Sequence, residues 1–229
     1  MDCCQKNELC ASKVPIFTEL SLDKLEEVNK LVNRKEYKKG EIIFLQGQLG
    51  KKIYILNSGQ AKIYKTSRDG KEHILRLLKE NDFFGEMVLF KEDSLDTSAQ
   101  AITDCIICEI NKKDLERLLK ENSNIVYRLL SAITSRLKEA EQMLESLALE
   151  DARQKTIRLL VDLAQESGVE TKEGLVIELP LSREGLANLL AMTQETLSRK
   201  LSNLQTEGII TIHGQKKVII RKKELLKNS

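Results

Sequence analysis

Cysteines crowd the N-terminal end of the chain. Cys3, Cys4 and Cys10 lie close together on a polar segment without periodicity, and Cys105 and Cys108 follow much later. Thiolates bind zinc and iron–sulfur clusters, and they also exchange disulfides. An odd total of five cysteines in a reducing compartment argues against a disulfide framework. The pattern therefore predicts a metal or redox site, and a polar tail that carries spare thiols is the alternative.

A second set of chemically useful side chains lies on one face of a predicted helix near the C-terminus. Leu197, Leu201 and Leu204 recur there at helical spacing and form the predicted buried stripe. The opposite face carries short or forked side chains that suit base edges, such as arginine for guanine and glutamate for the cytosine amine. An ordinary helical hairpin with a solvated face is the alternative. The candidate base-contacting residues are Gln194, Glu195, Ser198, Arg199 and Ser202.

Residues 181–208 predict two short helices joined by a tight turn at Ala191. Ser182 is expected to cap the first helix and Thr193 the second, because their hydroxyls can accept hydrogen bonds from unpaired backbone N–H groups. Gly208 is placed to end the second helix in the left-handed conformation that glycine adopts easily. A helix-turn-helix of this kind places its second helix in the major groove of DNA.

A predicted β-hairpin follows the second helix. Its strands are the apolar runs 209–212 and 218–220, which flank a His-Gly-Gln turn and make the unit a winged helix. Lysines gather in this part of the chain, and Lys200, Lys216 and Lys217 are the candidates for contacts to DNA phosphates. The C-terminal part is therefore predicted to bind double-stranded DNA.

Composition limits the remaining choices. The chain has 229 residues, of which 41% are hydrophobic and 31% charged, and its formal net charge is only +2, so the basic surface must be local. No apolar run approaches the length of a membrane helix, and the first residues lack the apolar core of a signal peptide. We therefore expect a cytoplasmic protein without a membrane partner. No nucleophile–base arrangement appears, so we do not expect an enzyme.

Short β-like runs punctuated by glycines fill residues 15–119, after a predicted helix at 21–32. Runs such as GEIIF, KIYIL, HILRLL and AITDCIICEI lie at close spacing with turn signals between them, which is typical of an antiparallel sandwich or roll. Asp69 and Gly70 are expected at the tip of a hairpin.

Residues 112–148 predict a helical stretch. From Ile133 onward its apolar positions alternate steps of four and three residues, which is the spacing of a heptad seam and suggests a parallel dimer. The helix could instead pack on its own domain. A dimer suits the predicted DNA binding, because two-fold proteins read palindromic sites. The candidate interface consists of Ile133, Leu137, Ala140, Leu144 and Leu147.

The predicted organisation is a cysteine-rich segment (1–14), a β-roll sensor domain (15–119), a dimerisation helix (120–148) and a winged helix-turn-helix domain (149–229). This order resembles the superfamily of the cyclic-AMP receptor protein and the fumarate–nitrate reduction regulator (Crp–Fnr). The resemblance is carried by KKGEIIFLQG, YILNSGQAKIY, DFFGEMVLF and TQETLSRKLSNLQTEGII. It implies an α+β fold with an N-terminal cyclic-nucleotide-binding-like antiparallel β-roll. It also implies a homodimeric transcription regulator with DNA and RNA polymerase as partners.

The second helix of the helix-turn-helix separates branches of this superfamily. Its pattern E-x-x-S-R, here Glu195, Ser198 and Arg199, resembles the fumarate–nitrate reduction branch, whose half-site resembles TTGAT. The chain departs from the family at Ala191, where glycine is usual. If this turn needs a positive φ, alanine costs on the order of 1 kcal/mol there.

The resemblance also implies an effector pocket in the roll. Gly85 and Glu86 resemble the start of the phosphate cassette, which continues at Ser98. Thr97 stands where the family's phosphate-binding arginine is expected, and a buried phosphate without that cation is poorly compensated. We therefore do not expect cyclic AMP. Another small organic effector, a different cyclic nucleotide or haem is the alternative, although His73 is expected on a strand surface.

The cysteines of this chain resemble those of the oxygen-sensing branch, whose pattern is C-x2-C-x5-C near the N-terminus with a fourth cysteine directly before Glu-Ile. Cys4 and Cys10 match the second spacing, and Cys108 precedes Glu-Ile, whereas Cys3 is adjacent to Cys4 instead of three residues before it. The resemblance thus implies a [4Fe–4S] cluster, for which four thiolates are needed. Its candidate ligands are Cys3, Cys4, Cys10 and Cys108, and Cys105 is assigned to the core. A dithiol switch is the alternative.

Overall fold

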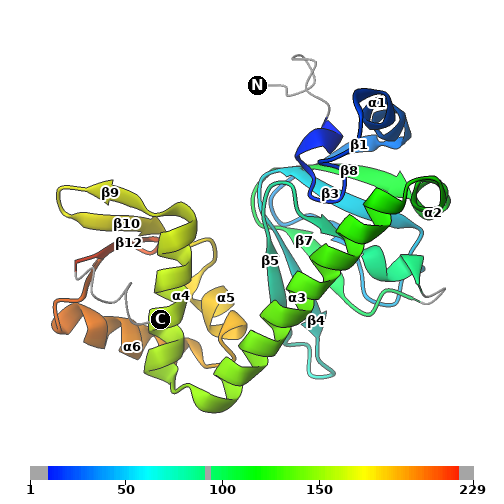
Figure 1. Cartoon of the computed structure of the whole chain (residues 1–229). Coiled ribbons are helices and arrows are strands. Elements are labelled where there is room, and N and C mark those ends of the chain that lie inside the picture. The colour runs from blue at the N-terminus through cyan, green and yellow to red at the C-terminus, as the bar shows by residue number, and fades with distance from the viewer. Residues whose placement is uncertain (1–9, 91–93, 222–229) are drawn as a thin grey trace. The chain divides into compact units, whose positions relative to one another are not determined.

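The computed structural model describes residues 10–90 and 94–221, and the side chains from residue 12 onward within them. The chain divides into two compact units, Met1–Glu139 and Ala140–Ser229, with the boundary inside the long helix α3 (Figure 1). No helix in the described ranges is long and apolar enough to cross a membrane.

Two four-stranded antiparallel sheets form the body of the first unit, in the strand orders β1-β8-β3-β6 and β2-β7-β4-β5. Alternating apolar residues from both sheets meet in one core, as expected for a roll. The strands are β1 (Asn33–Tyr37), β2 (Ile42–Phe44), β3 (Lys52–Ser58), β4 (Ala61–Thr66), β5 (Glu72–Leu78), β6 (Phe83–Phe84), β7 (Ser98–Ala101) and β8 (Cys105–Asn111).

Glycines allow the tight connections of this roll. Gly70 has φ +82° at the tip of the β4–β5 hairpin, as its Asp-Gly sequence predicts. Gly59 has φ +90°, and a Cβ there would lie 2.4 Å from the Asp104 carbonyl oxygen and 2.9 Å from the Cys105 sulfur. A side chain at Gly59 would therefore push apart the ends of β3 and β8.

Helices cover the roll, and the predicted helical stretch consists of two of them. The helices are η2 (Cys10–Lys13), α1 (Leu22–Leu31), η3 (Glu86–Leu89), α2 (Lys112–Glu121) and α3 (Ser123–Leu149). The helical stretch predicted for 112–148 is interrupted at Asn122, whose φ of −137° and ψ of 94° are extended. The Asn122 side chain donates to the Leu118 carbonyl at 3.1 Å and so satisfies the end of α2.

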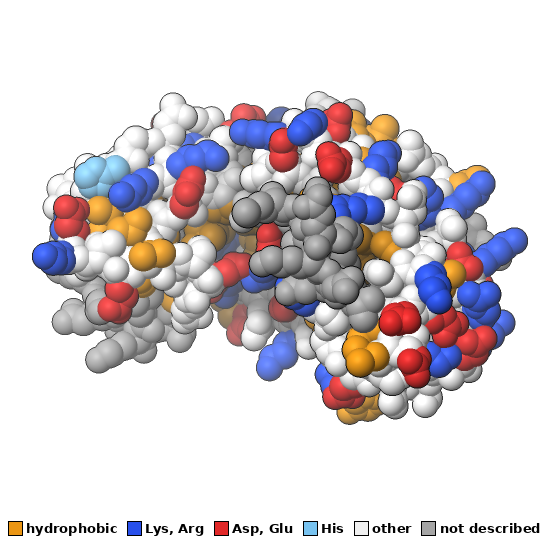
Figure 2. All heavy atoms as spheres, turned by 90° about the horizontal axis from the view of Figure 1, so that it is seen from above, with side chains coloured by type: hydrophobic (Ala, Val, Ile, Leu, Met, Phe, Trp, Pro, Cys, Tyr) orange, Lys and Arg blue, Asp and Glu red, His pale blue; other side chains and the backbone are white. Residues whose placement is uncertain are grey.

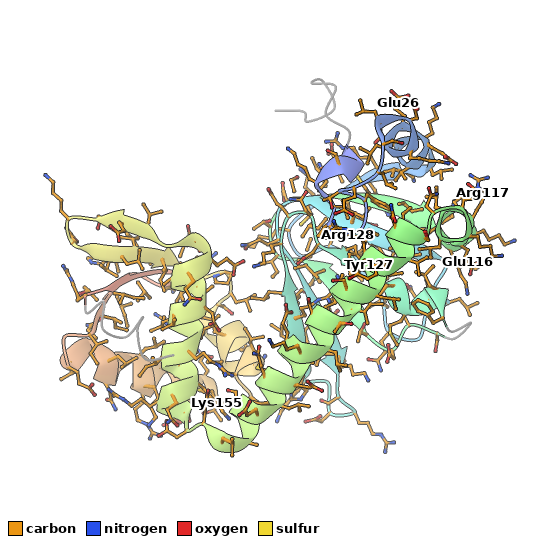
Figure 3. The ribbon with its side chains drawn as sticks, in the orientation of Figure 1. Glu26, Glu116, Arg117, Tyr127, Arg128 and Lys155 are labelled. Carbon is orange, nitrogen blue, oxygen red and sulfur yellow. The ribbon has the colours of Figure 1, made fainter. Side chains whose placement is uncertain are left out.

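The segment before α1 is part of the core. Val14, Ile16 and Phe17 are at most 2% exposed and belong to the same apolar cluster as Ile125 and Leu129 of α3. Arg128 of α3, labelled in Figure 3, forms an ion pair with Glu19. The backbone that follows Cys10 is therefore held against the roll and the first turns of α3.

The second unit is a helical bundle with a small sheet. Its elements after α3 are α4 (Ala152–Ser167), β9 (Val169–Thr171), β10 (Gly174–Glu178), α5 (Arg183–Leu189), α6 (Gln194–Thr206), β11 (Ile210–His213) and β12 (Lys217–Ile220). The sheet has the order β11-β12-β10-β9, so the strand before α5 pairs with the predicted hairpin. Asp151 caps α4 in a capping box, and Lys155 donates to the Leu147 carbonyl at 3.2 Å (Figure 3). The α+β prediction with a roll, a long helix and a winged helix is confirmed.

Candidate nucleic-acid interface and sensor residues

Helices α5 and α6 form the predicted helix-turn-helix. Ser182 Oγ accepts from the Gly185 N–H and Thr193 Oγ1 from the Thr196 N–H, both at 3.2 Å, so both predicted caps are present. Ala191 has φ +50° in the turn between them. That conformation costs a non-glycine residue on the order of 1 kcal/mol. The turn is nevertheless closed by the Met192 N–H, which donates to the Ala187 carbonyl at 2.9 Å.

The apolar stripe of α6 fixes the orientation of the helix. Leu197, Leu201 and Leu204 are at most 3% exposed, as predicted. They pack on α5 and α4, and Arg153 of α4 binds Glu207 beyond the end of α6 through two hydrogen bonds, one of 2.6 Å. Because the stripe is buried, the opposite face of α6 must point to solvent.

The candidate base-contacting residues lie on that solvent face. Gln194, Glu195, Arg199 and Ser202 are exposed, and Ser198 is half-buried. In the part of the chain that the structure describes, neither Glu195 nor Arg199 has an ion-pair partner within 4 Å. A carboxylate and a guanidinium that remain available to solvent are also available to base edges.

The wing is bound directly to α6. Gln205 Oε1 accepts from the Ile212 N–H at 3.0 Å, and the Arg221 N–H donates to the Ile209 carbonyl at 2.8 Å. Lys216 and Lys217 are exposed at the turn between β11 and β12, and Lys200 is half-buried on α6. These cations are therefore held at fixed positions relative to the solvent face of α6. Elsewhere basic and acidic side chains are interspersed, as on the face in Figure 2.

Sequence reasoning missed one cation of the helix-turn-helix, Arg183. It is the first residue of α5, directly after the cap Ser182, and its Nη1 is buried without a hydrogen-bond partner among the described residues. Burial lowers the pKa of Arg183. A guanidinium next to helix N–H groups is suited to an anion such as a DNA phosphate. An arginine immediately after a helix cap is the sequence signal that could have found it.

Two of the predicted effector residues, Glu86 and Ser98, make polar contacts within the chain. Gly85 has φ +80° at the start of η3, and Glu86 Oε1 lies 2.7 Å from Arg136 Nη1 of α3. Ser98 is 2% exposed, and its hydroxyl accepts from the Gln46 N–H at 2.9 Å. Thr97 is half-buried directly before β7. His73 is exposed, as expected.

The two cysteines of β8 lie inside the roll. Cys105 and Cys108 are each 2% exposed, and their three-residue separation places them on opposite faces of the strand. Cys105 Sγ donates to the Gln60 carbonyl at 3.1 Å, and burial raises the pKa of this thiol, which suits a core residue. Cys10 begins η2, whereas Cys3 and Cys4 lie outside the described residues.

A buried polar group adjoins Cys108. Glu109 accepts from Tyr37 at 3.0 Å and from Lys52 at 2.6 Å, so strands β1 and β3 both bind this carboxylate. Burial, and then the hydrogen bond to Glu109, raise the pKa of Tyr37. Burial raises the pKa of Tyr54 to about 12. Among the described residues no group of three or more His, Cys, Asp or Glu side chains could hold a metal ion.

The predicted seam of α3 is largely exposed. Leu137, Leu144 and Leu147 are 59%, 66% and 36% exposed, and Ala140 is also exposed. Ile133 is partly buried against the roll core. Tyr127 (Figure 3) and Leu130 extend the exposed apolar surface toward the start of the helix.

Comparisons with known proteins agree with this architecture. The cyclic nucleotide-binding domain family matches residues 34–122, and the Crp-like helix-turn-helix domain family matches residues 154–229. The chain is 30% identical to the cyclic AMP receptor protein of Thermus thermophilus over 93% of this chain and 94% of that protein. It is 27% identical to the anaerobic regulatory protein of Bacillus subtilis, over 91% and 88% of the two chains.

A solved structure extends the similarity to the whole fold. The c-di-GMP responsive global regulator CLP of Xanthomonas campestris matches with a TM-score of 0.78 and 25% identity, over 88% of this chain and 100% of that one. The relatives carry names from different branches, and all of these names are of regulators, not enzymes. This chain therefore belongs to the Crp–Fnr superfamily of DNA-binding transcription regulators.

Proposed function

We propose that the chain is a homodimer that reads a palindrome with TTGAT-like half-sites under the control of an oxygen- or redox-labile cysteine site. The observation that carries the DNA specificity is the solvent face of α6, where Glu195, Ser198 and Arg199 match the fumarate–nitrate reduction pattern. RNA polymerase is the further partner proposed for the DNA-bound dimer.

Each residue of the interface has a proposed role. Arg199 donates two hydrogen bonds to a guanine, Glu195 accepts from a cytosine amine, and Ser198 contacts a neighbouring base. The hydroxyls and cations around the α6 face bind phosphates and set the register on the duplex. These positioning residues are Ser182, Thr193, Gln194, Lys200, Ser202, Lys216 and Lys217, to which the structure adds Arg183.

Dimerisation through α3 is supported by the unpartnered seam. Leu137 and Leu144 lie seven residues apart and are more than half exposed, which is unfavourable for leucines on an isolated helix. Burying two leucines per chain would contribute several kcal/mol, at roughly 1.5–3 kcal/mol for each side chain. Two α6 helices would then read the two halves of a palindrome.

Two observations support a cysteine ligand set drawn from the N-terminal segment and the roll. Cys10 opens η2, and Val14 and Phe17 are buried in the same apolar cluster as Cys108. Cys3, Cys4, Cys10 and Cys108 would hold a [4Fe–4S] cluster, whose chemistry when bound is oxygen-labile redox sensing. The role of the chain is to tie the N-terminal segment to the roll and to α3, through Val14, Phe17 and the Glu19–Arg128 ion pair.

Three features of the roll argue against cyclic AMP. Glu86, which would bind ribose hydroxyls, is paired with Arg136, and the Ser98 hydroxyl already accepts the Gln46 N–H. Thr97 cannot replace the cation that a buried phosphate needs. The alternative is control by a small organic effector, haem or a cyclic nucleotide bound in the roll.

Anaerobic purification followed by an absorption spectrum and assays for iron and acid-labile sulfide tests the sensor. A broad visible absorption with stoichiometric iron and sulfide is expected. A sharp Soret band would indicate haem instead. If iron and sulfide are absent but thiol oxidants change DNA binding, the cysteines act as a dithiol switch and the cluster proposal is wrong.

A further inference from the structure

A half-buried arginine of the roll has one side-chain nitrogen without a partner among the described residues. Arg76 Nε on β5 is buried and has no hydrogen-bond acceptor in the part of the chain that the structure describes. Burial lowers the pKa of Arg76, and the nearby positive charge of Arg136 lowers it further. The negative charges of Glu86, Asp82 and Glu139 raise this pKa by a smaller amount, without a hydrogen bond to Arg76. An unpaired buried charge is costly, so an acceptor is expected at this place in the functional assembly.

The neighbouring Arg136 of α3 makes several contacts inside the chain, although its Nη1 is also buried without a hydrogen bond among the described residues. Its Nη1 lies 2.7 Å from Glu86 Oε1, its Nη2 donates to the Phe83 carbonyl, and its guanidinium carbon lies 3.9 Å from the centre of the Phe83 ring. Arg136 and Glu86 are each more than four-fifths buried. This Arg76–Arg136–Glu86 cluster therefore holds two guanidiniums and one ion-paired carboxylate.

The heptad of α3 shows where another carboxylate would come from. With Leu130, Leu137 and Leu144 at positions a and Ile133, Ala140 and Leu147 at positions d, Arg136 occupies a g position and Glu141 the following e position. In a parallel two-stranded coiled coil, g residues of one helix face the following e residues of the other helix, and oppositely charged pairs form there. Glu141 is exposed on α3 and has no ion-pair partner within 4 Å among the described residues of its own chain.

We infer that in the dimer the partner subunit's Glu141 joins the Arg76–Arg136–Glu86 cluster and supplies its second carboxylate. The inference rests on the proposed dimer of α3. The contact would make each cluster complete only in the dimer. It would also link η3 of one subunit, through Glu86 and Arg136, to α3 of the other subunit. A parallel, in-register seam is the arrangement that allows this contact on both sides.

Charge exchange between two variants of the full chain tests the contact. Homodimers of Arg76→Glu and of Glu141→Arg are mismatched in both clusters, whereas the heterodimer pairs Glu with Arg in one cluster and keeps the natural pair in the other. Native mass spectrometry of an equimolar mixture should show a heterodimer fraction well above about one half, which is the value for random exchange. The matched control pairs Arg76→Glu with Glu145→Arg, and it should stay at random exchange.

A milder variant tests the contact even if the charge-reversal variants misfold. Glu141→Gln should raise the dimer dissociation constant several-fold in sedimentation and flatten its dependence on salt, whereas Glu145→Gln should do neither. Random exchange in the mixture, or equal effects of the two glutamine variants, would overturn the inference while the wild-type dimer stands. A monomeric wild-type chain would instead refute the proposed dimer itself.

Discussion

Gln205 of α6 and Ile212 of the wing are joined by a hydrogen bond, in which the Gln205 side-chain oxygen accepts from the Ile212 backbone N–H at 3.0 Å. The bond fixes β11 against α6, so the wing lysines and the base-contacting face move together. Gln205→Ala should lower stability by about 1 kcal/mol, because one net hydrogen bond is lost. Hydrogen exchange should show a faster Ile212 amide in this variant.

The Arg221 amide is the internal control for that measurement. It donates to the Ile209 carbonyl and does not depend on Gln205. Its protection should therefore be unchanged in Gln205→Ala. Equal loss of protection at both amides would mean that the hairpin as a whole had loosened, and unchanged exchange at Ile212 would contradict the proposed role of Gln205.

Arg199 should carry base specificity. Its side chain is exposed on the face of α6 opposite the buried leucines. Arg199→Ala should weaken binding to the TTGAT palindrome by about 1–3 kcal/mol and relax the preference at one base pair. Fluorescence anisotropy with a set of duplexes, each changed at a single base pair, measures both effects.

Lys217→Ala is the matched control, because Lys217 is also exposed but lies on the wing. It should weaken all duplexes alike and reduce the slope of log affinity against log salt by about one unit. If Lys217→Ala changed the base preference and Arg199→Ala did not, the two assigned roles would be reversed.

The α3 seam should hold the dimer. Leu137→Glu combined with Leu144→Glu places charges on two apolar positions that are more than half exposed in the single chain. Sedimentation should show monomers that have lost specific DNA binding, since a single α6 reads too few bases. Leu149→Glu is the control, because Leu149 is 75% exposed but lies off the seam. A dimer that survives the double substitution would rule out this interface.

Serine substitutions of the cysteines should differ in their effect on the iron and sulfide content. Cys108→Ser and Cys10→Ser should lose the iron and sulfide of anaerobically purified protein. Cys105→Ser should keep them, because Cys105 is buried on the opposite face of β8 and donates to the Gln60 carbonyl. Loss of the cofactor in Cys105→Ser alone would exchange the assignments of the two β8 cysteines.

The helix-turn-helix could be predicted in detail because its signals are local. The caps Ser182 and Thr193, the stripe from Leu197 to Leu204 and the positive φ of Ala191 each depend on neighbours within a few residues. The same reasoning missed β1, because Asn33–Tyr37 is mostly charged and is a strand only through its pairing with β8. It also missed the break at Asn122, since the apolar spacing continues across it.

Contacts between distant elements could not be predicted from the sequence. The pairing of Glu86 with Arg136 joins residues fifty positions apart, and the burial of Arg76 follows from how β5 and α3 pack. Glu86 and Ser98 could be recognised as cassette positions from the family resemblance. Their partners within the chain are Arg136 for Glu86 and the Gln46 N–H for Ser98. No local sequence pattern specifies where these partners lie.

The central claim is sequence-specific DNA binding by a dimer, and an anaerobic anisotropy titration of the full chain tests it most directly. The probe is a duplex with two inverted TTGAT half-sites one helical turn apart, and the competitor has both half-sites scrambled at the same salt concentration. The account predicts two chains per duplex and a preference on the order of 10³ or more for the palindrome. Equal affinity for the two duplexes, or one chain bound per duplex, would contradict it.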